Sequence, residues 1–202
     1  MENMYDQIGK PSMAYAFVEK IERQDPLNPT RYIRRGYFYL YDCQFGPALE
    51  QFRLLYQADP ASPLAQTSYS QILVYNGKQD EALSIFNRIG KVDRTNVMNV
   101  YSFLLKYALL KDKESALGLI TSDFRKTCWR DFEWSYWVAN RLSLAGAKAE
   151  ALGWLKNAID RGFINYPFLQ CDPFLDNIRG EERFKKLLEQ AKYEWEHFKV
   201  PE

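Results

Sequence analysis

The sequence has few of the residues on which common metal sites depend. Only one histidine, His197, occurs among 202 residues, and the three cysteines lie far apart without a Cys-x-x-Cys pair. A zinc site needs several nitrogen or sulfur ligands, so one isolated histidine does not build one. His197 lies in a charged C-terminal stretch, and we interpret it as a surface residue. We therefore predict no metal site.

Motifs for nucleotide binding and for acyl transfer are also missing. The stretches NGKQD and IGKVD contain Gly-Lys, but neither has the glycine five residues earlier that a phosphate-binding loop requires. Neither Gly-x-Gly-x-x-Gly nor Gly-x-Ser-x-Gly occurs. We interpret the carboxylates of Asp131 and Glu133 as solvated helix ends. The sequence thus predicts a protein that is not an enzyme and that binds no cofactor.

Neither a strong net charge nor a long hydrophobic run is present. The 27 Lys and Arg residues nearly balance the 26 Asp and Glu residues, for a net charge of +1. A nucleic-acid-binding surface usually carries a clear basic excess, so we predict no nucleic acid partner. The longest apolar stretch, residues 97–110, is interrupted by Asn99, Ser102 and Lys106. Because a membrane span needs about 20 apolar residues, we predict a soluble chain without a membrane partner.

The N-terminus and the cysteines bear on the cellular compartment. No stretch near Met1 resembles a signal peptide, and Cys43, Cys128 and Cys171 are odd in number and scattered. In a chain without a secretion signal, such cysteines are typical of reduced, mostly buried thiols. We therefore expect a cytoplasmic protein.

What the sequence does contain is a repeat of about 34 residues. Alanines recur at equivalent places in similar short stretches, such as FGPALEQF and NGKQDEALSIF, and these are Ala14, Ala48, Ala82, Ala116 and Ala151. Bulky residues follow four positions later, at Phe52, Phe86, Ile120 and Leu155. Further large residues precede the alanines in the same phase, at Tyr39, Leu73, Tyr107 and Leu142. A fixed period of this length indicates a stacked repeat architecture.

Each period is interpreted as two short helices joined by a turn. Gly77 and Gly146 are expected to supply two of the turns, and Gly46-Pro47 a third. Pro47 suits the first turn of a helix, where its missing N–H is not needed. The small alanine would let the second helix approach the first closely, and the bulky residue after it would fill the space between neighbouring repeats.

At these positions the sequence resembles the tetratricopeptide repeat (TPR) family. Two stretches carry the family pattern best, at Gly36, Ala48, Phe52 and Pro60 and at Ala139, Ala151 and Leu155. Residues 97–120 depart most from it, because Leu104 stands where Gly36 stands and no closing proline follows. The resemblance implies an all-α fold, a right-handed α-solenoid of TPR-like helical hairpins with a C-terminal capping helix.

The repeat boundaries follow from this phase. We expect a single domain over residues 1–202, with a partial repeat at 1–28, repeats at about 29–62, 63–96, 97–130 and 131–164, and a capping segment at 165–202. Because few residues precede the turn at Gly9, we expect further sequence upstream in the natural protein.

The capping segment has its own sequence signals. Asp172 is a predicted helix N-cap, with Pro173 at the first helical position. The closing stretch is similar to that of TPR arrays in bacterial multidomain regulators. After Glu181 one helix face is apolar and is expected to cover the last repeat, at Phe184, Leu187, Leu188, Ala191, Trp195 and Phe198.

The resemblance implies a non-catalytic protein–protein interaction module that binds a peptide or a partner helix in its concave groove. Most of the aromatic residues must be core, but a subset on first helices is predicted to line this groove: Tyr37, Tyr41, Gln71, Tyr75, Tyr101, Tyr136 and Asn140. Tyrosines there would offer stacking area and a hydroxyl group. The alternative is a C-terminal regulatory or sensory segment of a larger bacterial signalling protein or transcription regulator.

Overall fold

The computed structural model describes residues 8–10, 19, 23 and 30–199. Within these residues every regular element is a helix and none is a strand, so the predicted all-α class is confirmed for this part of the chain. The predicted partial repeat around Ala14 lies outside the described residues.

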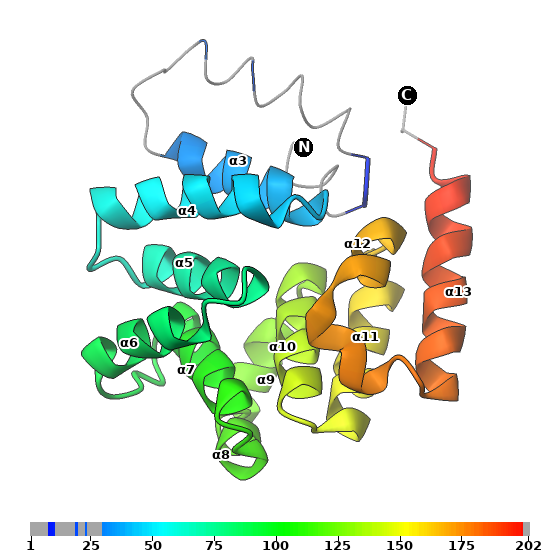
Figure 1. Cartoon of the computed structure of the whole chain (residues 1–202). Coiled ribbons are helices and arrows are strands. Elements are labelled where there is room, and N and C mark those ends of the chain that lie inside the picture. The colour runs from blue at the N-terminus through cyan, green and yellow to red at the C-terminus, as the bar shows by residue number, and fades with distance from the viewer. Residues whose placement is uncertain (1–7, 11–18, 20–22, 24–29, 200–202) are drawn as a thin grey trace.

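The first four helices of the described region form two pairs. They are α3 (Thr30–Tyr41) with α4 (Phe45–Ala58), and α5 (Pro63–Tyr75) with α6 (Gln79–Ile89). Each packs on the next along the chain, as Figure 1 shows. The start of α5 has a clear local cause, because the Ser62 hydroxyl accepts a hydrogen bond from the Ala65 amide and Pro63 occupies the first turn.

The next two pairs are less alike. They comprise α7 (Val97–Leu109) with α8 (Lys113–Gly118) and α9 (Ser122–Cys128), and α10 (Phe132–Leu144) with α11 (Lys148–Asp160). The second helix of the third pair is split, because α8 ends at Gly118 and Thr121 then caps α9 by accepting from the Phe124 amide. Ile120 therefore lies between two helices and is only half-buried, while Leu119 beside it is buried.

The turn inside each pair has one conformation that recurs with the sequence period. Its φ is positive, between 57° and 80°, at Cys43, Gly77, Lys111 and Gly146. The following amide donates a hydrogen bond of 2.8–2.9 Å back to Tyr39, Leu73, Tyr107 or Leu142. This is the Schellman motif, in which a residue in the left-handed conformation ends a helix. The turn between α3 and α4 is formed at Cys43 and not at Gly46-Pro47, because both of these residues already belong to α4. Pro47 does lie in the first turn of α4, as predicted.

The repeated small residues lie where the two helices of a pair meet. Ala48, Ala82, Ala116 and Ala151 each have no exposed surface. Gly36 of α3 is equally constrained, because a Cβ atom there would lie 2.5 Å from the ring of Phe52. The ring cannot swing away easily, since Phe52 is itself 1% exposed. The close approach of α3 and α4 therefore depends on the missing side chain of Gly36.

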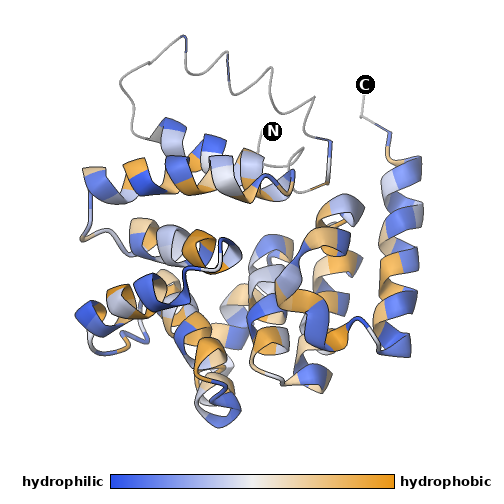
Figure 2. Cartoon of the chain, in the orientation of Figure 1, coloured by the Kyte–Doolittle hydropathy of each residue, from blue (hydrophilic) through white to orange (hydrophobic). Residues whose placement is uncertain are grey.

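Helix α10 lies at the centre of the molecule. Every residue from Ser135 to Ser143 is buried, so the helix is covered on all sides. It packs against α7, α11 and the short 3-10 helix η1 (Pro173–Ile178). Figure 2 shows many hydrophobic residues in α7 and α11, the helices on either side of α10, whereas hydrophilic and hydrophobic residues alternate along α13.

The C-terminal part comprises α12 (Tyr166–Cys171), η1 and α13 (Glu182–His197). Asp172 caps η1 by accepting from the Phe174 amide at 2.8 Å, as predicted. The predicted apolar face of α13 is confirmed: Phe184, Leu187 and Ala191 are buried, and Leu188, Trp195 and Phe198 are half-buried. Helix α13 packs on α11 and α12, and the Trp195 indole donates to the Gly9 carbonyl at 3.0 Å.

Replacing Gly36 with alanine should destabilise the protein, because the new methyl group would overlap the Phe52 ring. We expect the free energy of unfolding to fall by about 1–3 kcal/mol, as overpacking typically does. Gly153→Ala is the matched control: Gly153 lies inside α11 with nothing within 4 Å of its Cβ position. There alanine should stabilise by about 0.5–1 kcal/mol. Urea denaturation of both variants tests the packing, and equal changes would contradict it.

Candidate functional site

The seven side chains predicted to line a groove converge inside the molecule. We call them the inner cluster: Tyr37, Tyr41, Gln71, Tyr75, Tyr101, Tyr136 and Asn140. All but two are at most 4% exposed, and the exceptions, Tyr37 and Tyr75, are half-buried. The expectation that they face an open groove is therefore wrong for this structure, because other parts of the chain cover them. Their role in binding a partner stays a prediction.

The centre of the inner cluster is the carboxylate of Asp172, which is completely buried. One carboxylate oxygen, Oδ1, accepts from the Tyr75 hydroxyl at 3.0 Å and from the Phe174 amide at 2.8 Å. The other, Oδ2, accepts from the Tyr136 hydroxyl and, at 3.1 Å, from Asn140 Nδ2. Four donors from α5, α10 and η1 thus satisfy one buried anion.

A buried cation lies on the other side of Asn140. Arg141 is 1% exposed, and its Nη1 donates to Asn140 Oδ1 at 3.2 Å, while Asn140 Nδ2 donates to Asp172. Arg141 also donates to Gln71 Oε1 at 2.8 Å and to the Tyr101 carbonyl at 3.3 Å. The Asn140 amide therefore links the buried arginine to the buried aspartate.

Burial shifts the proton equilibria of these groups in the expected directions. Desolvation raises the pKa of Asp172, although its hydrogen-bond donors partly offset this effect. Desolvation and the neighbouring Asp172 raise the pKa of Tyr75 and of Tyr136 well above the ordinary value for tyrosine. Both hydroxyls therefore stay neutral and remain donors. Burial lowers the pKa of Arg141.

The remaining tyrosines of the inner cluster are hydrogen-bonded to other helices. The Tyr37 hydroxyl lies 3.2 Å from Ser68 Oγ of α5, and burial raises the pKa of Tyr37 to about 12. The Tyr41 hydroxyl donates to Glu133 of α10, a residue predicted to be solvated. The Tyr101 hydroxyl donates to the Trp134 carbonyl at 2.9 Å. These bonds tie α3 to α5 and α10, and α7 to α10.

Residues 163–178, which we call the inserted segment, contact four members of the inner cluster: Tyr41, Tyr75, Tyr136 and Asn140. Phe163 stacks on Tyr136, with ring centroids 4.0 Å apart, and Phe174 stacks on Tyr75 at 4.3 Å. Phe168 meets Tyr41 edge to face at 5.1 Å. Together with Asp172, these aromatic residues fill the space that faces the first helices.

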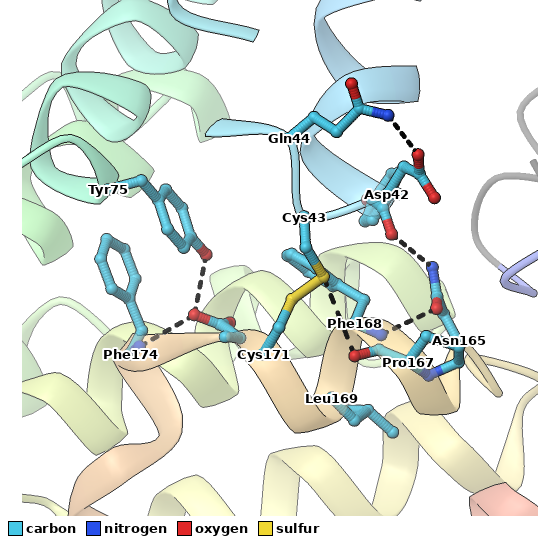
Figure 3. The surroundings of a disulfide bond; sticks show 12 residues. Asp42, Cys43, Gln44, Tyr75, Asn165, Pro167, Phe168, Leu169, Cys171 and Phe174 are labelled. Carbon is cyan, nitrogen blue, oxygen red and sulfur yellow. Dashed lines mark hydrogen bonds between the residues drawn. A yellow bond between two sulfur atoms is a disulfide. The ribbon is translucent and has the colours of Figure 1, made fainter. Parts of the chain in front are cut away.

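A disulfide fixes the inserted segment to the first described helix pair, as Figure 3 shows. It joins Cys43, in the turn between α3 and α4, to Cys171 at the end of α12, across 128 residues of sequence. The prediction of reduced thiols is therefore wrong for these two cysteines. Their distance in sequence gave no sign that the fold brings them within bonding distance.

The third cysteine agrees with the prediction. Cys128 is a free, buried thiol, and burial raises its pKa to about 11. The disulfide removes one premise of the predicted cytoplasmic location, because persistent disulfides are rare in reducing compartments. The compartment stays a prediction.

Sequence reasoning missed several members of this site. Asp172 was predicted only as a helix cap, and Arg141 was not singled out. The one available signal for Arg141 is its place in VANRLSLAG, a stretch of small and apolar residues where a charged side chain needs buried partners. Nothing local to the sequence identifies those partners, because Gln71 and Asp172 come from other elements.

Elsewhere the described residues line two hollows of note. One, of about 630 Å³, is lined by residues of α3 and α4 together with Glu19 and Arg23. The other measures about 380 Å³ and lies between α4, α5 and α6. Tyr56 and Tyr69 stack in the second hollow, with ring centroids 5.0 Å apart, and Arg53 and Arg88 flank them.

Among the described residues, no cluster of His, Cys, Asp and Glu is arranged to hold a metal ion. None of the described helices has the length and apolar character needed to cross a membrane.

Comparisons with known proteins give no family assignment: no protein-family model matches the chain, and no curated protein matches it. The resemblance to the TPR family therefore stays a prediction, based on the periodic residues.

Replacing Asp172 with asparagine should reduce stability in a pH-dependent way. Asparagine keeps one acceptor oxygen, so its NH₂ group would face two of the four donors, and we expect a loss of about 1–3 kcal/mol. Because the folded-state pKa of Asp172 is raised, its contribution is largest below the ordinary value of 3.8 and falls as the pH rises through the raised pKa. The stability gap between wild type and Asp172→Asn should narrow between pH 4 and pH 8 in urea denaturation. A stability gap that widens as the pH rises would show that the four hydrogen-bond donors outweigh desolvation and lower the pKa of Asp172.

Removing the disulfide should destabilise the protein through the long loop it closes. We expect Cys171→Ser and Cys43→Ser to lower the free energy of unfolding by about 2–5 kcal/mol. Cys43→Gly should lose about 1 kcal/mol less than Cys43→Ser, because position 43 has a φ of 60°, which favours glycine. Thermal denaturation with and without a reductant checks this, since reduced wild type should behave like Cys171→Ser. Variants as stable as the oxidised wild type would contradict the bond.

Proposed function

We propose that this chain is a non-catalytic protein-interaction module, built as a right-handed solenoid of TPR-like helical hairpins. Its inner cluster would recognise a short segment that carries an aspartate next to aromatic residues. The architecture is supported by the identical turns at Cys43, Gly77, Lys111 and Gly146. It is also supported by the contacts of α5 with α7 and of α7 with α10, which place successive first helices side by side.

The observation that carries this proposal is that the inner cluster already holds such a segment, supplied by its own chain. Asp172 receives hydrogen bonds from Tyr75 of α5 and from Tyr136 and Asn140 of α10. The ring of Phe174 lies flat on Tyr75, with 8° between the planes. The groups that hold the segment therefore come from different helix pairs, as they do when a repeat array grips an extended peptide.

The chemistry of the inner cluster favours a particular ligand class. Neutral hydroxyl and amide donors, with Arg141 behind them, suit a single carboxylate. Aromatic faces beside them suit phenylalanine-type side chains, which prefer stacked or edge-to-face contacts. The partner would therefore present an exposed Asp-x-Phe stretch in a loop or tail.

A peptide-binding measurement tests this function. The peptide has the sequence of residues 165–178 with serine in place of Cys171, and the protein is the full chain carrying Asp172→Ala and Phe174→Ala, which weakens its own occupant. We expect saturable binding by fluorescence anisotropy. A peptide with asparagine at the position of Asp172, and Asp176 kept, should bind at least about tenfold more weakly, since charge-assisted hydrogen bonds contribute about 1.5–3 kcal/mol.

Circular dichroism of the double variant is the control for folding. No binding to a folded variant, or equal binding of the two peptides, would refute recognition of the carboxylate by the inner cluster.

A second candidate function is the regulatory or sensory segment of a larger signalling protein or transcription regulator. The disulfide favours it, because a covalent bond between distant segments is a device that redox conditions can change. The natural reading frame upstream of Met1 tests this candidate. It is supported if the frame encodes a catalytic or DNA-binding domain, and a stop codon directly upstream would exclude it.

A further inference from the structure

We propose that the Cys43–Cys171 disulfide is a redox latch that keeps the inserted segment on the inner cluster, and that its reduction makes the inner cluster available to a partner's segment. This inference rests on the proposed function and names the regulation of the same site. The ligand class is an acidic–aromatic peptide, and the effector is a dithiol reductant.

The latch acts at the middle of the inserted segment. Cys171 directly precedes Asp172, whose carboxylate accepts three hydrogen bonds from side chains of α5 and α10. Cys43 belongs to a different part of the chain, the turn between α3 and α4. The covalent bond therefore ties the best-held point of the segment to the first described helix pair.

The position of Cys43 indicates that the cysteine is there for its bond rather than for the turn. Its φ of 60° lies in the left-handed region, and two of the four equivalent turns, at Gly77 and Gly146, use glycine. A residue with a Cβ atom at such a position costs about 1–2 kcal/mol. The turn alone therefore gives no reason for a cysteine at this position.

The inserted segment is joined to the rest of the chain in a way that permits exchange. Gly162, with a φ of 112°, precedes it, and Gly180 follows it. A Cβ at either glycine would meet nothing within 4 Å, so neither position is locked by packing. The segment can thus leave the inner cluster by rotation about its two ends while α11 and α13 stay folded.

The noncovalent contacts of the segment explain why reduction alone does not unfold it. Phe163, Phe168 and Phe174 are each at most 3% exposed, and Asp172 stays hydrogen-bonded. A partner segment with the same aspartate and aromatic groups would make equivalent contacts. After reduction, the partner segment competes with an inserted segment that can dissociate from the inner cluster, although it stays part of the chain. Before reduction, the partner segment competes with an inserted segment that the disulfide holds in place.

The chemical step is an ordinary thiol–disulfide exchange. A thiolate of the dithiol attacks one sulfur of the disulfide, which forms a mixed disulfide and releases the other cysteine. The second thiol of the reductant then attacks the reductant's own sulfur in the mixed disulfide and releases the remaining cysteine. Two electrons and two protons pass to the protein, which leaves thiols at Cys43 and Cys171 and a disulfide in the reductant. Both cysteines are half-buried. The Pro167 carbonyl, 3.9 Å from Cys43 Sγ, is placed to accept from the new thiol.

Hydrogen–deuterium exchange of the full chain tests the latch without any ligand. Loss of the disulfide lowers global stability, so all amides that exchange through global unfolding should exchange faster after reduction with dithiothreitol. The latch predicts that exchange of the α12 and η1 backbone amides accelerates at least tenfold more than exchange of the α7 and α10 amides. The Cys43→Ser/Cys171→Ser variant should show the faster exchange with and without dithiothreitol. Equal acceleration of all four elements, or unchanged exchange of α12 and η1, would overturn the latch.

Binding of the Cys171→Ser peptide of residues 165–178 to the wild-type chain separates the latch from the function beneath it. The latch predicts at least tenfold tighter binding to the reduced than to the oxidised protein. Equal, measurable affinities would overturn the latch and leave the proposed function in place. Faster exchange of α12 and η1 with no binding in either state would support the latch and overturn the proposed function.

Discussion

The buried carboxylate of Asp172 is the constraint on which the arrangement of the C-terminal half depends. A carboxylate removed from water is costly unless donors surround it, and here four donors from α5, α10 and η1 must all lie within reach of two oxygen atoms. Arg141, linked through Asn140, adds a compensating positive charge. Moving the inserted segment away leaves the donors of α5 and α10 without a partner unless another acceptor replaces Asp172, so these hydrogen bonds favour the closed arrangement.

The periodic backbone provides the frame for this interaction. Each Schellman turn ends a first helix at the equivalent point of the period. The recurring alanines are fully buried, and the absence of a side chain at Gly36 leaves space for the ring of Phe52. The third pair deviates because α8 ends at Gly118 and α9 follows it. Its first helix still contributes Tyr101, whose carbonyl accepts from Arg141.

The inner cluster illustrates what a repeat pattern can predict. The pattern indicates which residues share one side of a helix, but not whether that side is exposed to solvent. The period correctly grouped Tyr75, Tyr136 and Asn140, which all donate hydrogen bonds to the carboxylate of Asp172. It could not indicate that the chain's own residues 163–178 would cover them, because that segment breaks the period. The same closure brings Cys171 to Cys43. The side of α5 and α10 that carries these residues is therefore covered by the chain's own inserted segment, which the disulfide joins to the first described helix pair.

By itself the sequence determined the helical class, the 34- to 35-residue spacing of the helix pairs, the cap at Asp172 and the apolar face of α13. These follow from local rules, in which side-chain size, glycine and spacing decide the structure within a few turns. Only the tertiary structure decided the partners of Asp172 and Arg141, the pairing of Cys43 with Cys171 and the burial of the inner cluster. Each of these joins residues from distant parts of the chain, and no local preference encodes which distant segments come together.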